Sequence, residues 1–272
     1  MRGFGDIAER LRRSTVQIFN GDTRSQGSGI VWNAGGLILT NSHVARSSQT
    51  EIELWDGRRF SARIASRDPR RDLATLRIVG VDSAALAPRL EPATAGDSTT
   101  LRPGELVIAV GNPLGFAGAL STGVVHSLGA LPGMGSQSWI RADVRLAPGN
   151  SGGPLANAEG RVIGVNTAIV NGLGVAVPSH TALDFVRRGS PPSLGVTLRP
   201  VDLGLHLLEV DPAGAAATAG LRSGDILLTR YDALGDALDS GSPTLKLHFL
   251  RGDGSKVREA VVRLAAQVEA AA

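Results

Sequence analysis

The chain has 272 residues, of which 42% are hydrophobic and 19% charged, a composition typical of a soluble globular protein with room for two or three compact units. The formal net charge is only +3 and no basic run is interleaved with aromatic residues, so a nucleic-acid partner is not expected. The sequence contains no cysteine, which excludes disulfides, thiolate metal sites and a cysteine nucleophile.

The start of the chain bears on its compartment. No apolar run approaches the roughly 20 residues that cross a bilayer. Residues 1–13 are charged and lack the hydrophobic stretch of a secretory signal peptide. Taken as written, the sequence predicts a cytoplasmic protein; the periplasm or cell envelope is the alternative if the N-terminus was trimmed.

After a short helix at residues 6–13, segments of β-type composition recur at short spacing in two groups of six. The first group comprises residues 15–19, 29–32, 37–40, 51–55, 59–65 and 73–79. A polar connection at residues 87–100 precedes the second group, which comprises residues 106–110, 123–127, 139–144, 154–156, 162–167 and 174–177. Many short strands bounded by Gly, Pro, Asn and Asp favour barrels or sandwiches over βαβ units. Two barrels in sequence are therefore predicted.

A different pattern follows the second group. Residues 179–188 predict a helix, and residues 188–193, with two prolines, predict a linker. Beyond them, residues 194–264 form a third unit with a small-residue helix at 213–219 and closing strands near 245–250 and 257–264.

Three residues carry the chemistry of nucleophilic catalysis, in the order His43, Asp72, Ser151. A serine is a poor nucleophile until an imidazole removes its proton, and the imidazole works best when a buried carboxylate holds its tautomer. Glycines beside Ser151 let the backbone turn sharply and direct free N–H groups at a developing oxyanion. The pattern predicts a serine protease with its site in the cleft between two barrels.

Each residue also has a simpler interpretation. His43 alone could be a surface histidine at a strand end, Asp72 the start of a strand, and Ser151 a turn residue. The nucleophile elbow of α/β-hydrolases is a further alternative, but it requires a helix after the serine and the order Ser, Asp, His. Here Pro154 and Gly160 bracket a segment too short for that helix. The order His, Asp, Ser is that of two-barrel proteases.

Five segments together closely resemble the HtrA/Deg family of serine endopeptidases. They are residues 27–31 (GSGIV), 40–44 (TNSHV), 72–76 (DLATL), 111–115 (GNPLG) and 148–155 (PGNSGGPL). The resemblance implies an all-β fold, in which a chymotrypsin-like double β-barrel protease domain at 14–188 precedes a small PDZ-like domain. It implies His43 as general base, Asp72 as orienting carboxylate and Ser151 as nucleophile. It also implies an oxyanion hole formed by the N–H groups of Gly149 and Ser151, and no metal or organic cofactor.

The expected substrate cleft is small or aliphatic and contains no acid to pair a basic side chain. It is formed by Leu146, Thr167, Ala168, Ile169 and Val170. This predicts cleavage after Val, Ala, Ile or Leu rather than after Lys or Arg. Arg141 and Arg145 depart from the family pattern, and an Arg145 that points into the pocket would favour an acidic residue instead.

The third unit is similar to the PDZ domain that follows the protease domain in this family. The resemblance implies a linker at 189–193 and a PDZ-like domain at 194–266, in which Leu194, Gly195 and Val196 bind peptides with apolar C-termini at a sheet edge. Residues 231–245 are shorter than in the family and contain Gly235 and Pro243. A short or missing groove helix is therefore predicted.

Taken together, the resemblance implies an ATP-independent endopeptidase that degrades unfolded or damaged proteins in protein quality control. It also implies a homotrimer or a multiple of one. The alternative is a peptide-binding chaperone or scaffold whose protease domain is inactive or rarely active.

Overall fold

The computed structural model of this chain describes residues 3–19, 27–47, 50–81, 86, 90–113, 116–132, 134, 137–252 and 256–264. It divides into two compact units between Gly189 and Ser190, each described here by itself. Several expected features lie outside the described residues: Leu114 and Gly115 of the GNPLG segment, part of the 87–100 connection, and the expected domain end at residue 266.

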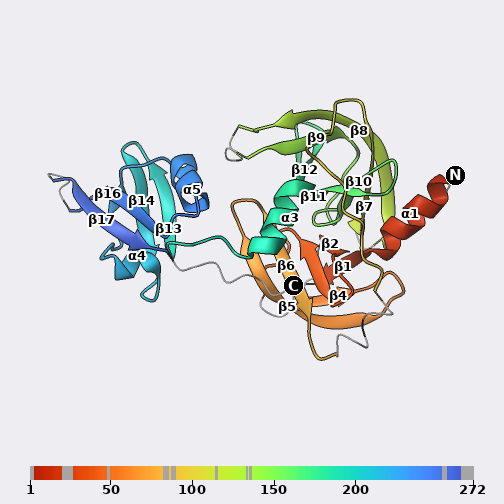
Figure 1. Cartoon of the computed structure of the whole chain (residues 1–272), viewed down its shortest axis with the longest axis horizontal. Helices are drawn as coiled ribbons and strands as arrows, with labels where there is room; N and C mark the ends of the chain where they lie inside the picture. Colours follow the sequence, from red (N-terminus) through yellow and green to blue (C-terminus); the bar gives the residue numbers. More distant parts are fainter. Residues whose placement is uncertain are drawn as a thin grey trace. The chain divides into compact units, whose positions relative to one another are not determined.

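The first unit contains two closed six-stranded barrels, orange and green in Figure 1. The first barrel has the spatial order β1-β2-β3-β6-β5-β4, with strands β1 (Thr15–Phe19), β2 (Gly27–Val31), β3 (Leu37–Thr40), β4 (Thr50–Glu53), β5 (Arg59–Asp68) and β6 (Leu73–Ile78). The second has the order β10-β11-β12-β9-β8-β7, with strands β7 (Leu106–Gly111), β8 (Ala119–Gly129), β9 (Trp139–Asp143), β10 (Pro154–Asn157), β11 (Val162–Val170) and β12 (Leu173–Pro178). The prediction of a chymotrypsin-like double barrel is confirmed.

Strand β2 is buried on both of its faces, unlike a strand of an isolated barrel. Because successive side chains of a strand point to opposite faces, Val31 enters the core of the first barrel while Ile30 faces the second barrel. In strand β3, likewise, Ile38 enters the core of the first barrel and Leu39 faces the second barrel. Burial on both faces therefore distinguishes β2 and β3 as strands at the junction of the barrels.

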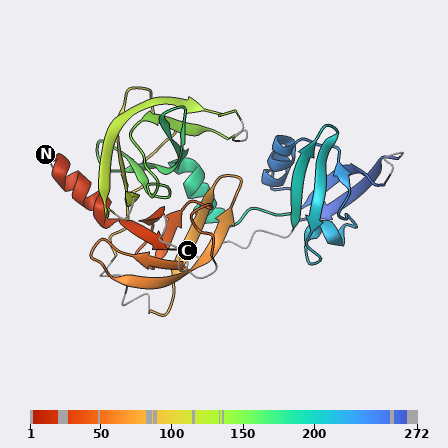
Figure 2. The ribbon, with the colours of Figure 1, turned by 180° about the vertical axis from the view of Figure 1, so that it is seen from behind.

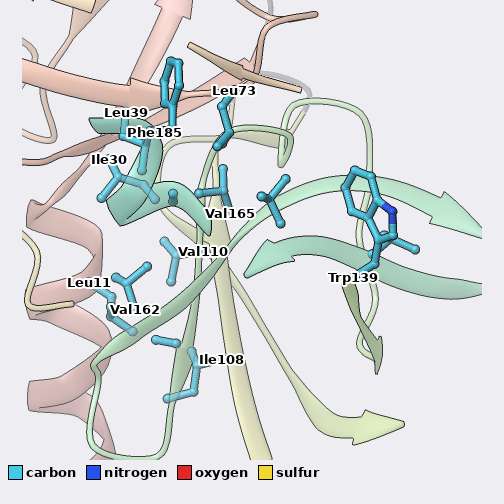
Figure 3. Close-up of a cluster of buried hydrophobic side chains, with 14 of the residues drawn as sticks. Leu11, Ile30, Leu39, Leu73, Ile108, Val110, Trp139, Val162, Val165 and Phe185 are labelled. Carbon is cyan, nitrogen blue, oxygen red and sulfur yellow. The ribbon is translucent and has the colours of Figure 1, made fainter. Parts of the chain in front are cut away.

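A hydrophobic cluster fills that junction (Figure 3). It takes side chains from both barrels and from two helices, among them Leu11, Ile30, Leu39, Leu73, Ile108, Val110, Val162, Val165 and Phe185. Each fully buried side chain of this size contributes about 1.5–3 kcal/mol relative to exposure. The cluster fixes one barrel against the other, and with it any groups that they present to each other.

Two helices of the first unit have described bounds. Helix α1 (Phe4–Arg13) begins two residues before the expected start and leads directly into β1, as its red ribbon in Figure 2 shows. Its Glu9 pairs with Arg12 and Arg13, each at 2.8 Å, and both arginines lie over the ring of Trp55. Helix α3 (Ser179–Arg188) lies where it was predicted.

The second unit is a five-stranded sheet with the order β13-β14-β15-β16-β17, consistent with a PDZ-like domain. Its elements are β13 (Val196–Val201), β14 (Gly204–Val210), α4 (Ala215–Thr218), β15 (Ile226–Leu227), α5 (Tyr231–Asp239), β16 (Thr244–Leu250) and β17 (Arg258–Arg263). The expectation that the helix in residues 231–245 is short or missing is wrong in its second alternative, since a helix of nine residues, α5, is present. Its Leu234 and Leu238, four residues apart, are buried in the core. That packing offsets the roughly 1 kcal/mol that a helical glycine such as Gly235 costs.

Within the described ranges, no helix combines the length and the apolar character needed to cross a membrane.

Candidate active site

His43 lies in a tight turn that follows β3. The N–H groups of Val44 and Ala45 both donate to the Asn41 carbonyl, at 3.2 and 3.1 Å. Asn41 and Ser42 are buried, whereas the His43 side chain is 42% exposed. The turn therefore holds its backbone inside the protein and presents the imidazole at the surface.

Asp72 stands directly before β6 with a φ of +54°, a left-handed conformation that few residues other than glycine adopt. The Asn41 side-chain amide donates to its carbonyl at 2.9 Å. Its Oδ1 accepts the His43 backbone N–H at 3.0 Å, and its Oδ2 lies 2.7 Å from His43 Nδ1. This geometry favours the tautomer with the proton on Nδ1, which leaves Nε2 free to accept a proton.

Thr167, on β11 of the second barrel, contacts the same carboxylate. Its hydroxyl donates to Asp72 Oδ2, and its side chain is buried. The sequence placed Thr167 in the substrate cleft and missed this contact. The local signal was a hydroxyl residue next to Asn166 in the otherwise apolar run of residues 162–170, and this signal does not identify Asp72 as the partner.

Ser151 belongs to a loop before β10, called here the Ser151 loop (residues 147–153). Its hydroxyl donates to the Thr167 carbonyl at 3.0 Å, and its own carbonyl accepts the Ser28 N–H at 2.7 Å. Among the described residues, no hydrogen bond joins Ser151 to His43. The structure thus joins His43 and Asp72 by direct hydrogen bonds. Ser151 is connected to Asp72 only indirectly in the described residues, because both bond to Thr167. Rotation of the Ser151 side chain about χ1 would move its hydroxyl away from the Thr167 carbonyl.

Within the Ser151 loop, the N–H groups of residues 149–153 divide into two sets. Those of Asn150, Gly152 and Gly153 donate to carbonyls at 2.8–3.0 Å. Those of Gly149 and Ser151 have no acceptor in the described part of the chain. Gly149 has a φ of +106°, and a Cβ there would lie 2.5 Å from the Asn112 carbonyl oxygen. Two free donors therefore flank the Ser151 side chain, as an oxyanion hole requires.

The residues of the expected cleft are only partly gathered. Leu146 packs with the core of the second barrel and lies over Gly174, where an added Cβ would be 3.0 Å from its Cδ1. On β11, Ala168 and Val170 are half-buried, and Ile169 is 53% exposed. Arg145 is exposed, so Leu146 rather than Arg145 packs against β12.

Arg141 lies on β9 opposite Val175 of β12. Its Nε is buried and has no hydrogen-bond partner within the described residues.

In the second unit, the expected peptide-binding residues lie at the start of the edge strand β13. Leu194 is buried in the core, and its carbonyl accepts the Ala216 N–H at 2.9 Å. Gly195 has a φ of +70°, and its N–H donates to the Ser193 hydroxyl at 3.1 Å. Val196 begins the strand, whose outer edge carries no partner in the sheet order of the described residues.

Comparison with known proteins places this geometry in context. Residues 27–165 match the trypsin-like peptidase domain. A DegP-like periplasmic serine endoprotease of Halomonas elongata is 32% identical over 271 residues, covering 89% of this chain and 54% of that protein. The periplasmic pH-dependent serine endoprotease DegQ of Escherichia coli is 35% identical over 229 residues, covering 74% of this chain and 49% of that protein. The chain thus spans about half the length of the curated relatives it matches.

Among solved structures, the HtrA-type protease AlgW with a tripeptide aligns with a TM-score of 0.65 at 26% identity and covers 97% of both chains.

The names of these relatives contradict the expected cytoplasmic location, because DegQ and the DegP-like proteins are named periplasmic. The expectation depended on the charged residues 1–13. Residues 4–13 form α1, whose Leu11 is part of the cluster between the barrels. Their charge reflects the exposed face of a packed helix and carries no information about compartment.

Proposed function

This chain belongs to the HtrA/Deg family of serine endopeptidases, and from that premise we propose that it hydrolyses peptide bonds in unfolded or damaged proteins without ATP. The observation that carries the proposal is the Asp72 carboxylate, which accepts both the backbone N–H and, at 2.7 Å, the Nδ1 of His43. This arrangement prepares an imidazole to act as a base at Nε2. The free N–H groups of Gly149 and Ser151 add the second requirement, stabilisation of an oxyanion.

The proposed reaction is acyl transfer. The Ser151 hydroxyl turns from the Thr167 carbonyl toward His43, attacks the scissile carbonyl and gives its proton to Nε2. Asp72 stabilises the resulting imidazolium, and the N–H groups of Gly149 and Ser151 bind the oxyanion. His43 then protonates the leaving amine. Water, deprotonated by His43, releases the new carboxyl end and regenerates Ser151.

Support for unfolded substrates comes from the cleft. Its residues are small or aliphatic, and the aliphatic Ile169 is exposed on β11. A chain must be extended to lie along a strand, and unfolded proteins expose the aliphatic side chains that folded proteins bury.

The proposal extends to the surroundings of the enzyme. We place it in the periplasm, as the names of the DegP-like and DegQ relatives suggest. We assign residues 14–188 to the protease domain, 189–193 to the linker and 194–266 to a PDZ-like domain that adds peptides with apolar C-termini to the edge of β13. A homotrimer or a multiple of it is the proposed assembly.

A second candidate is a peptide-binding chaperone or scaffold with an inactive or rarely active protease domain. The observation that favours it is the Ser151 hydroxyl bond to the Thr167 carbonyl in place of His43.

Labelling with a fluorophosphonate separates the two candidates. The protease should be labelled at Ser151 and digest casein, and Ser151→Ala and His43→Ala should abolish both. A folded chain that binds unfolded casein but is neither labelled nor able to cleave it would support the chaperone instead.

A further inference from the structure

Ser28 is a fully buried polar residue in β2, between the two barrels. A buried hydroxyl is costly unless its hydrogen bonds are satisfied. That of Ser28 makes three: it donates to the Gly149 carbonyl at 2.7 Å, and it accepts the Asn112 backbone N–H at 2.9 Å and the Asn112 side-chain amide at 3.2 Å. Ser28 therefore connects the first barrel to the Ser151 loop through a side chain that no substrate reaches.

The direction of the Ser28 proton follows from the inventory of donors. A hydroxyl has one proton and two lone pairs. The two N–H groups of Asn112 occupy both lone pairs, so the proton can only point to the Gly149 carbonyl. The Asn112 amide is itself oriented, because its Oδ1 accepts the Gly118 N–H at 2.8 Å. Asn112 thus determines that the Ser28 hydroxyl donates its proton to the Gly149 carbonyl.

That bond holds one particular peptide group. The peptide between Gly149 and Asn150 has its carbonyl bonded to Ser28 Oγ and its N–H bonded to the Ala147 carbonyl at 3.0 Å. The two free N–H groups, of Gly149 and Ser151, belong to the peptides on either side of it. Glycine rotates more freely than other residues, so the direction of the Gly149 N–H depends on how firmly its neighbours are held. Ser28 also donates its backbone N–H to the Ser151 carbonyl at 2.7 Å.

We propose that Ser28 and Asn112 are positioning residues for the oxyanion hole of this enzyme. This inference rests on the proposed protease function. Ser28 holds the Gly149–Asn150 peptide through its hydroxyl and the Ser151 carbonyl through its backbone, and Asn112 fixes the hydroxyl in that direction. Oxyanion donors act in the transition state more than in the bound substrate. A loss of their alignment therefore lowers kcat and leaves KM nearly unchanged.

Two variants test the proposal by different routes. Ser28→Ala removes the hydroxyl. Asn112→Asp keeps the size of the side chain and an acceptor for Gly118, but replaces the amide donor with an acceptor that draws the Ser28 proton away from Gly149. Ser98→Ala is the matched control, because Ser98 is also a buried serine in the first unit, and its hydroxyl bonds to His180 at the start of α3.

For a short peptide substrate, Ser28→Ala and Asn112→Asp should each lower kcat about 10- to 100-fold, less than or similar to the loss of a whole oxyanion donor. KM should stay within about threefold of the parent, because ground-state binding is little affected. Ser98→Ala should match the parent. A kcat within twofold of the parent in both test variants would overturn the proposal, and so would an equal loss in Ser98→Ala.

Amide hydrogen exchange gives a readout that does not need turnover. In Ser28→Ala and Asn112→Asp, the Asn150 N–H should exchange at least tenfold faster than in the parent, while Ser98→Ala leaves it unchanged. If the parent protein does not hydrolyse the peptide, the proposed protease function fails. The exchange rate of the Asn150 N–H then tests by itself whether Ser28 and Asn112 hold the Ser151 loop. Unchanged protection of Asn150 in a folded test variant would then reject the proposal for Ser28 and Asn112.

Discussion

The Thr167 hydroxyl of the second barrel donates to the carboxylate of Asp72, which the first barrel contributes. The carboxylate therefore accepts three donors, and the other two come from His43. Thr167 also accepts the Ser151 hydroxyl through its carbonyl. Thr167 thus contacts two members of the proposed triad: its side chain binds the carboxylate of Asp72, and its backbone carbonyl binds the hydroxyl of Ser151.

Replacement of Thr167 by valine, which has nearly the same shape, should lower kcat/KM about tenfold. The reason is that one of the donors that orient Asp72 is lost, a bond of about 1.5–3 kcal/mol when the acceptor is charged. Peptide hydrolysis measures the effect. Thr15→Val is the control, since Thr15 is also buried and its hydroxyl bonds to the Leu11 carbonyl instead. Equal activity of Thr167→Val and the parent would show that the contact is dispensable.

Asp72→Asn should lower kcat roughly 10⁴-fold while the protein stays folded, the magnitude known for the corresponding change in a well-studied protease. An amide at this position donates to Nδ1 of His43 and so favours the tautomer with the proton on Nε2, which cannot act as a base. The rate of fluorophosphonate labelling measures the loss. Labelling of Asp72→Asn at the parental rate would show that Asp72 is not a member of the triad.

Gly149→Ala and Gly104→Ala form a matched pair. Both glycines have a positive φ, +106° and +90°, so alanine at either should cost about 1–3 kcal/mol in backbone strain. At Gly104 no atom lies within 4 Å of the added Cβ, whereas at Gly149 the Cβ meets Asn112 and Pro113. Only Gly149→Ala should therefore lose activity, by 100-fold or more, as expected for a displaced oxyanion donor. Peptide hydrolysis and thermal unfolding separate the two effects; similar activity in both variants would argue against Gly149 in the hole.

Cleavage of casein should occur predominantly after Val, Ala, Ile or Leu. Leu146 packs over Gly174, and neither it nor the cleft residues of β11 offer a carboxylate to a basic side chain. Mass spectrometry of the fragments identifies the cut sites. Predominant cuts after Lys or Arg would refute the prediction. Predominant cuts after Asp or Glu would also refute it, and would show that the Arg145 side chain points into the specificity pocket.

The stability that Glu9 contributes to α1 should depend on pH. Hydrogen bonds from Arg12 and then Arg13 lower the pKa of Glu9 from 4.5 to about 2. A lowered pKa means that this stabilisation is present above pH 4.5 and disappears as the pH falls toward 2. Glu9→Gln should therefore lower the free energy of unfolding at pH 7 by less than about 1 kcal/mol, because the pair is partly exposed, and thermal unfolding measures the difference. The difference from the parent should shrink steadily below pH 4.5, and a constant difference down to pH 2 would contradict the assignment.

The sequence predicted the two barrels because most of their strands are short segments bounded by turn residues, while the long strands β5 and β8 extend beyond the predicted 59–65 and 123–127. The positions of His43, Asp72 and Ser151 followed from their motifs. The role of Thr167 could not be predicted, because β11 shifts register between Asn166 and Ala168 and leaves Thr167 as the extra residue of a bulge. A bulge redirects side chains, and simple alternation no longer tells which face a residue occupies.

The sequence left open whether helix α5 forms, for another reason. Gly235 and Pro243 are local signals against a helix, yet Leu234 and Leu238 gain more from the core than the glycine costs. Ser28 likewise has no distinguishing local signal, since its function depends on Asn112 and Gly149, which are more than 80 residues away in the chain.

The division of the site between two barrels has a consequence for the newly made protein. His43 and Asp72 precede residue 79, whereas Gly149, Ser151 and Thr167 all come later in the chain. Chains are synthesised from the N-terminus, and early parts begin to fold first. A half-made chain on the ribosome therefore contains the proposed base and its orienting carboxylate but not the proposed nucleophile. By the proposed mechanism, it can cut a neighbouring chain only after the second barrel has folded and packed against the first.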